Sequence, residues 1–304
     1  MTDILNLQNT ANGSDIVVES VEFASGKATL KGLLFMPVPS EGMLPALIVT
    51  GAWTTVKEQM PGTYARELAR RGIAALVFDF AGWGESNGTP RFVEDPATKT
   101  ADIHAAVSFL QSRPDVDDSK LYGLGVCASS GYMATAVAGN GGLRKLALVA
   151  PWLHDPEMAE AIYGGAEAAS GLIAVSDEAA KSAEPTILTA ASTSDDSAPM
   201  YQAPYYTEED RGLIAEYDNK FSVLSWKPWL TYDAQASADR LTKPILMVGS
   251  NGMALPAGAQ AYEKRTSAPV GKMWLGEEIS QFDFYDRKDI VLAASDAVAE
   301  FFNA

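Results

Sequence analysis

The chain has 304 residues, of which 47% are hydrophobic and 20% are charged, as in an ordinary folded globular protein. Its formal net charge of -16 argues against nucleic acid or anionic lipid as a partner, because binding to phosphates requires clustered Lys and Arg. The sequence has one cysteine, no Cys/His cluster and no apolar run long enough to cross a bilayer, which excludes a disulfide framework, a structural zinc site and a membrane span.

The N-terminal sequence Met1–Gln8 lacks the basic and apolar regions of a signal peptide. A lone cysteine also fits a reducing compartment, so we expect a cytoplasmic protein. We expect it to bind a small molecule, to need no metal or cofactor, and to bind neither nucleic acid nor membrane. The sequence leaves a homo-oligomer open.

Eight apolar runs are predicted to be strands. The first two alternate in polarity, as an antiparallel pair does, whereas later runs are continuous apolar blocks typical of parallel strands covered on both faces. In chain order the predicted strands are Ile16–Phe23, Ala28–Met36, Leu44–Thr50, Ala74–Phe80, Lys120–Val126, Lys145–Ala150, Pro244–Gly249 and Lys272–Leu275.

Segments with helical spacing of apolar residues alternate with these strands. Such alternation predicts an α/β protein, with a mostly parallel sheet and helices on both faces. The predicted helices are Glu58–Arg71, Thr100–Gln111, Ser129–Ala138 and Leu292–Phe302.

The alternation stops between residues 152 and 235. A stretch of this length without a function would be unusual, so we expect an inserted cap over the carboxyl edge of the sheet. The core would then comprise residues 1–151 and 236–304. Two of the six tryptophans lie in Asp218–Tyr232, and Trp152 begins the insertion. These aromatic residues indicate an apolar or aromatic substrate, which Trp152 is predicted to contact.

The fifth predicted strand runs directly into a turn at the only cysteine, Cys127. Gly125 and Ser129 flank it at minus two and plus two, and a helix of small residues follows. This layout predicts a nucleophile elbow, in which a tight strand-to-helix turn raises the nucleophile into a pocket. The helix N-terminus would favour a thiolate, and the backbone N–H of Ala128 would be one oxyanion donor. Alternatively, Cys127 is a core residue, or the turn begins two residues later and Ser129 is the nucleophile.

Other walls of this site are expected at the ends of neighbouring strands. The third strand ends in a Gly-Ala-Trp turn, where the backbone N–H of Ala52 or Trp53 is the candidate second oxyanion donor. Glu58 follows this turn and is a candidate for contact with the thiol or the substrate. After the fourth strand, Asp79 is expected to organise its loop by hydrogen bonding. Ser129 is predicted to lie at the site in either register of the elbow.

No base for the thiol is evident from the sequence. Of the two histidines, His104 lies on the flank of a predicted helix and is expected to be structural. His154 follows the sixth strand, which ends at the same edge of the sheet as the elbow, so it is the candidate general base. The alternatives are Asp283, Asp286, Lys57 and Tyr285.

The strand order, the elbow and the turn Gly82-Trp-Gly-Glu-Ser86 resemble the α/β-hydrolase fold, and specifically its dienelactone-hydrolase-like branch, whose elbow uses cysteine. The resemblance covers nearly the whole chain and implies a Cys–His–Asp triad, with the acid after the seventh strand and the histidine after the eighth. This sequence has Asn251 near the acid position and Gln281 at the expected histidine. Glutamine cannot accept a proton near neutral pH, so both amides are predicted to contact substrate instead.

Three functions are consistent with this pattern. The first is a hydrolase of an ester, lactone or related acyl bond, with Cys127 as nucleophile and a backbone oxyanion hole. The second is a non-hydrolytic enzyme on the same scaffold, such as a cyclase, isomerase or lyase, in which Asn251 and Gln281 position the substrate. The third is a non-catalytic binding protein, because one scaffold hosts many chemistries.

Overall fold

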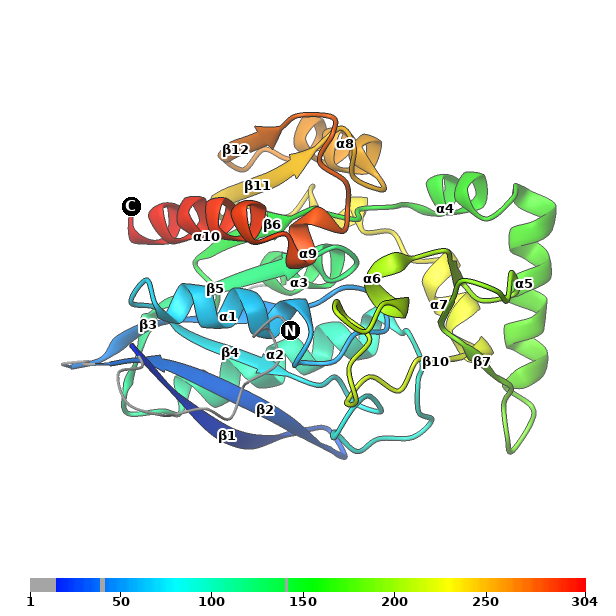
Figure 1. The fold of residues 1–304 in the computed structure, drawn as a ribbon, viewed down its shortest axis with the longest axis horizontal. Helices are drawn as coiled ribbons and strands as arrows, with labels where there is room; N and C mark the ends of the chain where they lie inside the picture. Colours follow the sequence, from blue (N-terminus) through cyan, green and yellow to red (C-terminus); the bar gives the residue numbers. More distant parts are fainter. Residues whose placement is uncertain (1–14, 39–41, 140–141) are drawn as a thin grey trace.

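The computed structural model describes residues 15–38, 42–139 and 142–304; the segment Met1–Gln8, predicted to hold no signal peptide, lies outside them. Eight strands of the described chain form one sheet in the order β1-β2-β4-β3-β5-β6-β11-β12 (Figure 1). All eight predicted strands are members of it. They are β1 (Ile16–Ser25), β2 (Ala28–Pro37), β3 (Leu44–Thr50), β4 (Ala74–Phe78), β5 (Val116–Val126), β6 (Lys145–Val149), β11 (Ile245–Ser250) and β12 (Val270–Leu275).

The sheet is mostly parallel, as predicted. β1 pairs with β2 and β2 with β4 in antiparallel fashion, and the remaining neighbours pair in parallel. Every residue of β4 is buried, whereas β1 exposes residues along its length. This difference follows from position, because an interior strand of this sheet is covered on both faces and an edge strand is not.

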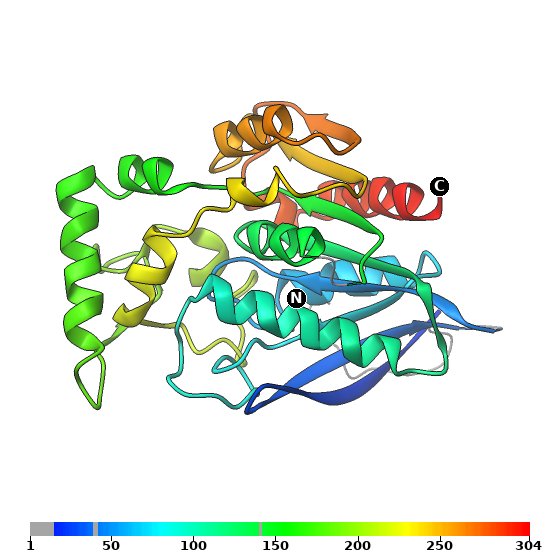
Figure 2. The same cartoon turned by 180° about the vertical axis from the view of Figure 1, so that it is seen from behind.

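Helices cover both faces of the sheet (Figures 1 and 2). In these views α1 (Met60–Ala69) and α10 (Lys288–Asn303) lie on one face, and α2 (Pro96–Gln111) and α3 (Ser129–Ala138) on the other. The bounds of α3 match the prediction. α2 begins at Pro96 rather than Thr100, because the Asp95 side chain accepts a hydrogen bond from the Ala97 N–H and caps the helix.

A further helix was absent from the sequence prediction. α8 (Pro256–Arg265) connects β11 to β12 and buries only Gly258, Ala259 and Tyr262. A helix that buries so few side chains has little apolar periodicity, which is the signal on which the prediction depends.

The chain between β6 and β11 forms short elements beside one end of the sheet, at the right of Figure 1 and the left of Figure 2. This is the segment predicted to be a cap; its status as a separate unit stays a prediction. The elements are α4 (Pro156–Ile162), α5 (Ala166–Ala179), β7 (Ile187–Thr189), β8 (Ala191–Ser192), β9 (Met200–Tyr201), α6 (Pro204–Thr207), β10 (Lys220–Ser222), η2 (Val223–Ser225), α7 (Trp226–Leu230) and η3 (Gln235–Ser237).

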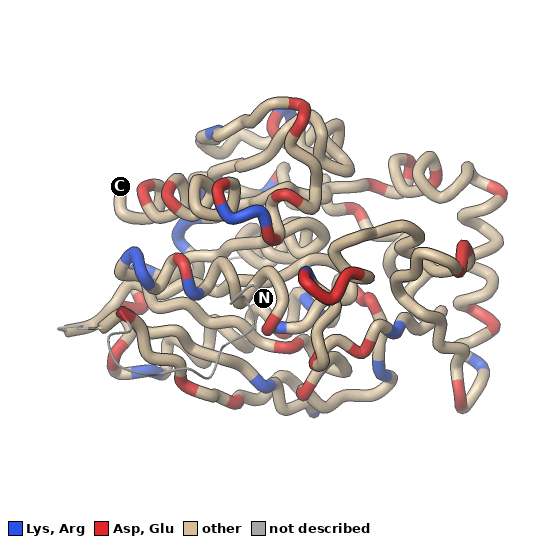
Figure 3. The backbone as a smooth tube through the Cα atoms, in the orientation of Figure 1, with Lys and Arg blue, Asp and Glu red and all other residues tan. Residues whose placement is uncertain are grey.

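Charged residues are distributed along the described chain without a long basic stretch. Figure 3 shows Lys and Arg scattered among Asp and Glu on most elements. Within the residues that the structure describes, no helix has the length and apolar character needed to cross a membrane.

Candidate active site

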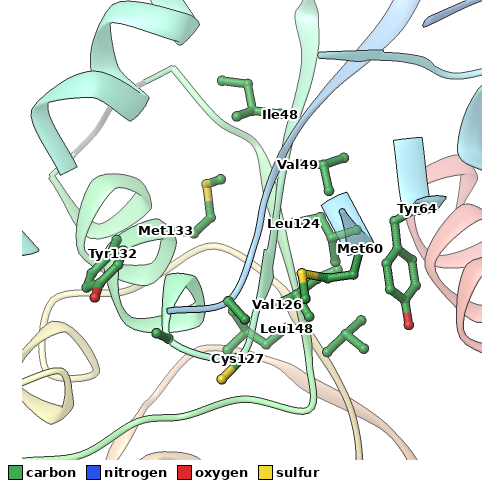
Figure 4. Packing of buried hydrophobic residues seen from close by; sticks show 14 of the residues in the cluster. Ile48, Val49, Met60, Tyr64, Leu124, Val126, Cys127, Tyr132, Met133 and Leu148 are labelled. Atoms are coloured by element: carbon green, nitrogen blue, oxygen red, sulfur yellow. The ribbon is translucent and has the colours of Figure 1, made fainter. Parts of the chain in front are cut away.

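Cys127 lies at the sharp turn between β5 and α3. Its φ is 56°, in the left-handed region that residues other than glycine rarely adopt. Its carbonyl accepts hydrogen bonds from the N–H groups of Ser130 and Trp152, at 3.0 Å each, and its own N–H donates to the Val149 carbonyl at 3.1 Å. Figure 4 shows the sulfur just beyond the buried side chain of Val126, at the end of the strand. The strained turn is therefore fixed from both sides, as at a nucleophile elbow.

The Cys127 sulfur opens onto a cavity of about 550 Å³ between the sheet edge and the segment that joins β6 to β11. The described lining residues include no charged side chain and no histidine. They are Trp53, Cys127, Ala128, Trp152, Ile162, Tyr163, Pro199, Met200, Ala203, Tyr206, Trp229, Gly252, Ala254, Ser280, Gln281, Phe282 and Tyr285. Such a lining suits an uncharged, largely apolar or aromatic ligand.

Hydrogen-bond donors surround the Cys127 sulfur. The backbone N–H groups of Ala128 and Trp53 and the hydroxyl of Tyr285 all bond to it. Burial raises the pKa of the Cys127 thiol to about 11, while these three hydrogen bonds lower it in part. The thiol is therefore protonated near neutral pH, although groups able to stabilise a negative charge lie against it.

Gln281 contacts Tyr285, the side chain that donates to the sulfur. Its Nε2 donates to the Ala150 carbonyl at 2.9 Å and to the Tyr285 hydroxyl oxygen at 3.0 Å, and its Oε1 accepts from the Ala254 N–H at 3.0 Å. The amide orientation is fixed, because a carbonyl can only accept and a backbone N–H can only donate. With its oxygen occupied by Gln281, the Tyr285 hydroxyl is left to donate its proton toward Cys127.

The structure gives His154 a different role from the predicted one. Its Nδ1 accepts from the Trp152 indole at 3.0 Å, its Nε2 bonds the Trp229 carbonyl at 2.9 Å, and the ring does not line the cavity. Burial lowers the pKa of His154. Both ring nitrogens are thus occupied within the protein, and His154 is not placed to take a proton from Cys127.

Two of the alternative bases are likewise engaged elsewhere. Asp283 accepts from the Ser280 N–H and hydroxyl, each at 2.7 Å, and Asp286 pairs with Arg211 at 2.5 Å. Neither carboxylate lines the cavity. Tyr285 is the one alternative that contacts the sulfur.

Glu58 lies in an ion cluster around the buried Lys57 and not, as predicted, in the cavity wall. Lys57 Nζ lies 2.7 Å from Glu58, 2.7 Å from Asp79 and 2.6 Å from Glu85. Asp79 also accepts from the N–H groups of Lys57 and Glu85, so its predicted part in organising the loop is seen directly. Glu58 thus pairs with Lys57 and is not among the residues that line the cavity.

Three other candidates lie outside the cavity. Asn251 is exposed, and its Oδ1 accepts from the Trp274 indole at 3.1 Å. Ser129 is fully buried in the first turn of α3, which leaves the register with Ser129 as nucleophile without support. Ala52 is buried behind the turn, so Trp53 is the residue of that pair whose N–H contacts the sulfur. Trp152 lines the cavity, and its contact with substrate stays a prediction.

Most of the aromatic wall was not singled out from the sequence. Tyr206 and Trp229 come from the segment before β11, and Phe282 follows Gln281. The only available signal was the enrichment of Trp and Tyr in that segment, because α6 and α7, which carry Tyr206 and Trp229, have four and five residues and are too short to show a helical period in the sequence.

Comparison with known sequences agrees with this architecture. The sequence profile of the X-Pro dipeptidyl-peptidase (S15) family matches residues 26–278. The uncharacterized protein YcjY of Escherichia coli (strain K12) is 28% identical over 282 residues, which cover 84% of this chain and 87% of that protein.

Two fungal enzymes match over a shorter region. Polyketide transferase claH of Penicillium crustosum is 34% identical over 123 residues, 39% of this chain and 40% of that protein. A thiohydrolase of Eupenicillium brefeldianum is 34% identical over 121 residues, 40% of this chain and 38% of that protein. Each alignment spans less than half of the fungal enzyme.

Solved structures show the same fold. The hypothetical protein PA2218 from Pseudomonas aeruginosa has a TM-score of 0.86 at 23% identity, with 96% of this chain and 94% of that chain covered. The α/β hydrolase GrgF from Penicillium sp. sh18 has a TM-score of 0.77 at 19% identity, with coverages of 94% and 98%. A dienelactone hydrolase from Anabaena variabilis has a TM-score of 0.57 at 13% identity, with coverages of 95% and 97%. The predicted α/β-hydrolase fold is confirmed.

Proposed function

Because the chain belongs to the X-Pro dipeptidyl-peptidase (S15) family, whose match covers most of its length, we propose that it cleaves an ester, lactone or related acyl bond with Cys127 as nucleophile. The observation that carries the proposal is the sulfur itself, held on a strained turn at the cavity with the N–H groups of Ala128 and Trp53 against it. Two backbone donors at a nucleophile form an oxyanion hole.

The cavity wall favours an uncharged acyl group of apolar or aromatic character over a peptide. A dipeptidyl-peptidase binds the free ammonium of its substrate, which calls for a carboxylate in the site. None of the described lining residues is acidic. The names of two matching enzymes, a thiohydrolase and a polyketide transferase, add support for an acyl substrate.

The first chemical step uses groups at the cavity only. Cys127 Sγ forms a bond to the carbonyl carbon, and the N–H groups of Ala128 and Trp53 hold the oxyanion. When the bond to the leaving group breaks, the thiol proton passes to that group, so no charge remains, and Tyr285 keeps its own proton. Water then attacks the thioester, the C–S bond breaks, and one proton of that water passes to Cys127 Sγ, which restores the thiol and releases the acid.

The test is acylation of Cys127 by a neutral aromatic ester, such as a p-nitrophenyl benzoate, followed by intact-protein mass spectrometry. We expect an added benzoyl group on the wild-type chain and none on Cys127→Ala. Since Cys127 is the only cysteine, an adduct lost in this variant is assigned without ambiguity. Full ester turnover by Cys127→Ala would rule the proposal out, and ligand-induced thermal stabilisation with no product would favour a binding protein.

A second candidate is a non-hydrolytic enzyme, and the observation that favours it is Gln281. An amide in place of a base can orient a substrate but cannot activate water, so an acyl-enzyme would await a better nucleophile, including one within the substrate. The mass of the product separates the two candidates, because hydrolysis adds one water and cyclisation or isomerisation adds none.

A further inference from the structure

A single buried carboxylate connects the two sides of the candidate oxyanion hole. Glu94 is fully buried. Its Oε2 accepts from the Thr54 N–H at 3.1 Å, and its Oε1 lies 2.8 Å from the Tyr132 hydroxyl and 2.6 Å from Lys99 Nζ. Its own N–H donates to the Ser225 hydroxyl at 2.8 Å. No part of Glu94 lines the cavity.

The Thr54 contact fixes the turn that carries one donor. Thr54 directly follows Trp53 and has a φ of 64°, which is costly for a β-branched residue. Besides the bond to Glu94, its hydroxyl lies 3.0 Å from that of Tyr217, and the residue is fully buried. Without the carboxylate, the Thr54 N–H would be buried and unpaired, and the turn would relax to a less strained form.

The Tyr132 contact fixes the other side. Tyr132 is fully buried on the first turns of α3, close in sequence to Ala128 and Cys127. Lys99 completes the network: its Nζ lies 4.7 Å from the Phe80 ring and 4.8 Å from the Trp83 ring, and its charge compensates that of Glu94. The carboxylate thereby sets the position of α3 relative to the turn after β3.

We propose that Glu94 is a positioning residue, which holds the N–H groups of Trp53 and Ala128 at the spacing required to bind one oxyanion. The inference rests on the proposed role of Cys127 as nucleophile. It assigns Glu94 no contact with substrate and no proton transfer. Its effect is on geometry, so it should appear in kcat and in the reactivity of the sulfur, and much less in KM.

Two double variants test this with matched charge. Glu94→Gln/Lys99→Met removes both charges and keeps an oxygen for the Thr54 N–H and an amide for Tyr132. Glu94→Met/Lys99→Met also removes both charges and leaves no acceptor. Buried ion pairs often tolerate apolar replacement, so both are expected to fold, which urea unfolding checks.

The measurements are ester turnover and the rate of iodoacetamide alkylation of Cys127 at pH 9. We expect the variant with Gln to retain most of both. In the variant with two methionines, kcat should fall about 100-fold, the loss typical of one oxyanion donor, with KM little changed. Its alkylation should slow by about threefold or more, as a hydrogen bond to the thiolate is lost.

Two single variants, Ser225→Ala and Tyr132→Phe, provide a control and an independent test. Ser225→Ala removes the partner of the Glu94 N–H and keeps the carboxylate, so both rates should stay within about twofold of wild type. Tyr132→Phe removes one hydroxyl and keeps both charges, so kcat should fall with KM unchanged. This arm decides the matter if the variant with two methionines does not fold.

The proposal would be overturned if the two double variants had equal kcat and equal alkylation rates, or if kcat were unchanged in Tyr132→Phe. Alkylation needs no substrate, so it reports on Glu94 even if the chain proves to have no esterase activity. Conversely, Cys127 can form an acyl-enzyme while Glu94 proves merely structural.

Discussion

At the scale of single residues, the Cys127 thiol is surrounded by hydrogen-bond donors, and no described side chain beside it is placed to accept its proton. Burial places the pKa of Cys127 at about 11, and the phenol that contacts it has a pKa well above its ordinary value, also through burial. Neither group gives up a proton readily near neutral pH. In the proposed reaction, acylation therefore depends on a proton passing directly from the sulfur to the leaving group.

Replacing Gln281 by histidine tests how much the missing base limits the reaction. In Gln281→His an imidazole, whose unperturbed pKa is about 6.5, would lie beside Tyr285 at the cavity. General-base assistance typically contributes about 100-fold or more, so we expect hydrolysis of a neutral aromatic ester to rise at least about tenfold. The gain should appear as pH rises through the histidine pKa, because only the neutral ring accepts a proton.

Gln281→Leu is the matched control, since it removes the amide and supplies no base. It should hydrolyse the ester no faster than wild type at any pH. An equal gain in both variants would mean that Gln281 blocks the cavity and that proton transfer is not limiting.

At the scale of elements, His154 secures α7 to the chain that leaves β6. It bonds the Trp229 carbonyl and the Trp152 indole, and both tryptophans line the cavity. His154→Phe removes the two ring nitrogens that make these hydrogen bonds. The Trp152 indole then loses its partner, whereas the Trp229 carbonyl still accepts from the Tyr232 N–H at 3.3 Å. A buried donor left unpaired costs about 1–3 kcal/mol, so the urea midpoint should fall, and acylation of Cys127 should still be detected by mass.

His154→Gln, which can both donate and accept, should recover part of the stability lost in His154→Phe. If it instead folds like wild type and abolishes acylation, His154 would be a general base after all.

At the scale of the whole molecule, the loops after β3 and β4 are joined by the cluster around Lys57. Burial alone would lower the pKa of Lys57, but Asp79 and Glu58 raise it above its ordinary value. Lys57→Met would leave Asp79 and Glu58 buried without a counter-charge, which typically costs about 3–5 kcal/mol. We expect this loss in urea unfolding at pH 7.

The pH dependence of that loss has a definite sign. Burial already raises the pKa of both Asp79 and Glu58, so the folded state holds their protons more tightly than the unfolded state. In Lys57→Met the stability should therefore increase as the pH falls and the carboxyls become neutral. Lys31→Met, which breaks an exposed pair with Glu22, is the control and should leave the urea midpoint nearly unchanged at either pH.

Sequence patterns predicted the sheet and the elbow well because both depend on local signals. Continuous apolar blocks identified the central strands, and the small residues around Cys127 identified the turn. The partners of Cys127 were harder to predict. Tyr285, in the short helix α9 (Asp283–Asp286), and Trp53, in the turn after β3, reach the sulfur from segments distant in sequence. Glu94 connects three segments through hydrogen bonds that no spacing rule encodes. The prediction for His154 relied on β6, the preceding strand, which ends at the same edge of the sheet as Cys127. The direction of the ring could not be predicted, and it points toward the Trp229 carbonyl.

The aromatic wall also gives the protein a built-in optical reporter. Trp53 lies 5.3 Å from Trp229 and 6.2 Å from Trp226, and Trp152 lies 6.3 Å from Trp229, between ring centroids. Four of the six tryptophans in the chain thus belong to one group at the cavity. Its intrinsic emission should be dominated by this group, so the entry of a ligand can be followed by fluorescence without any label.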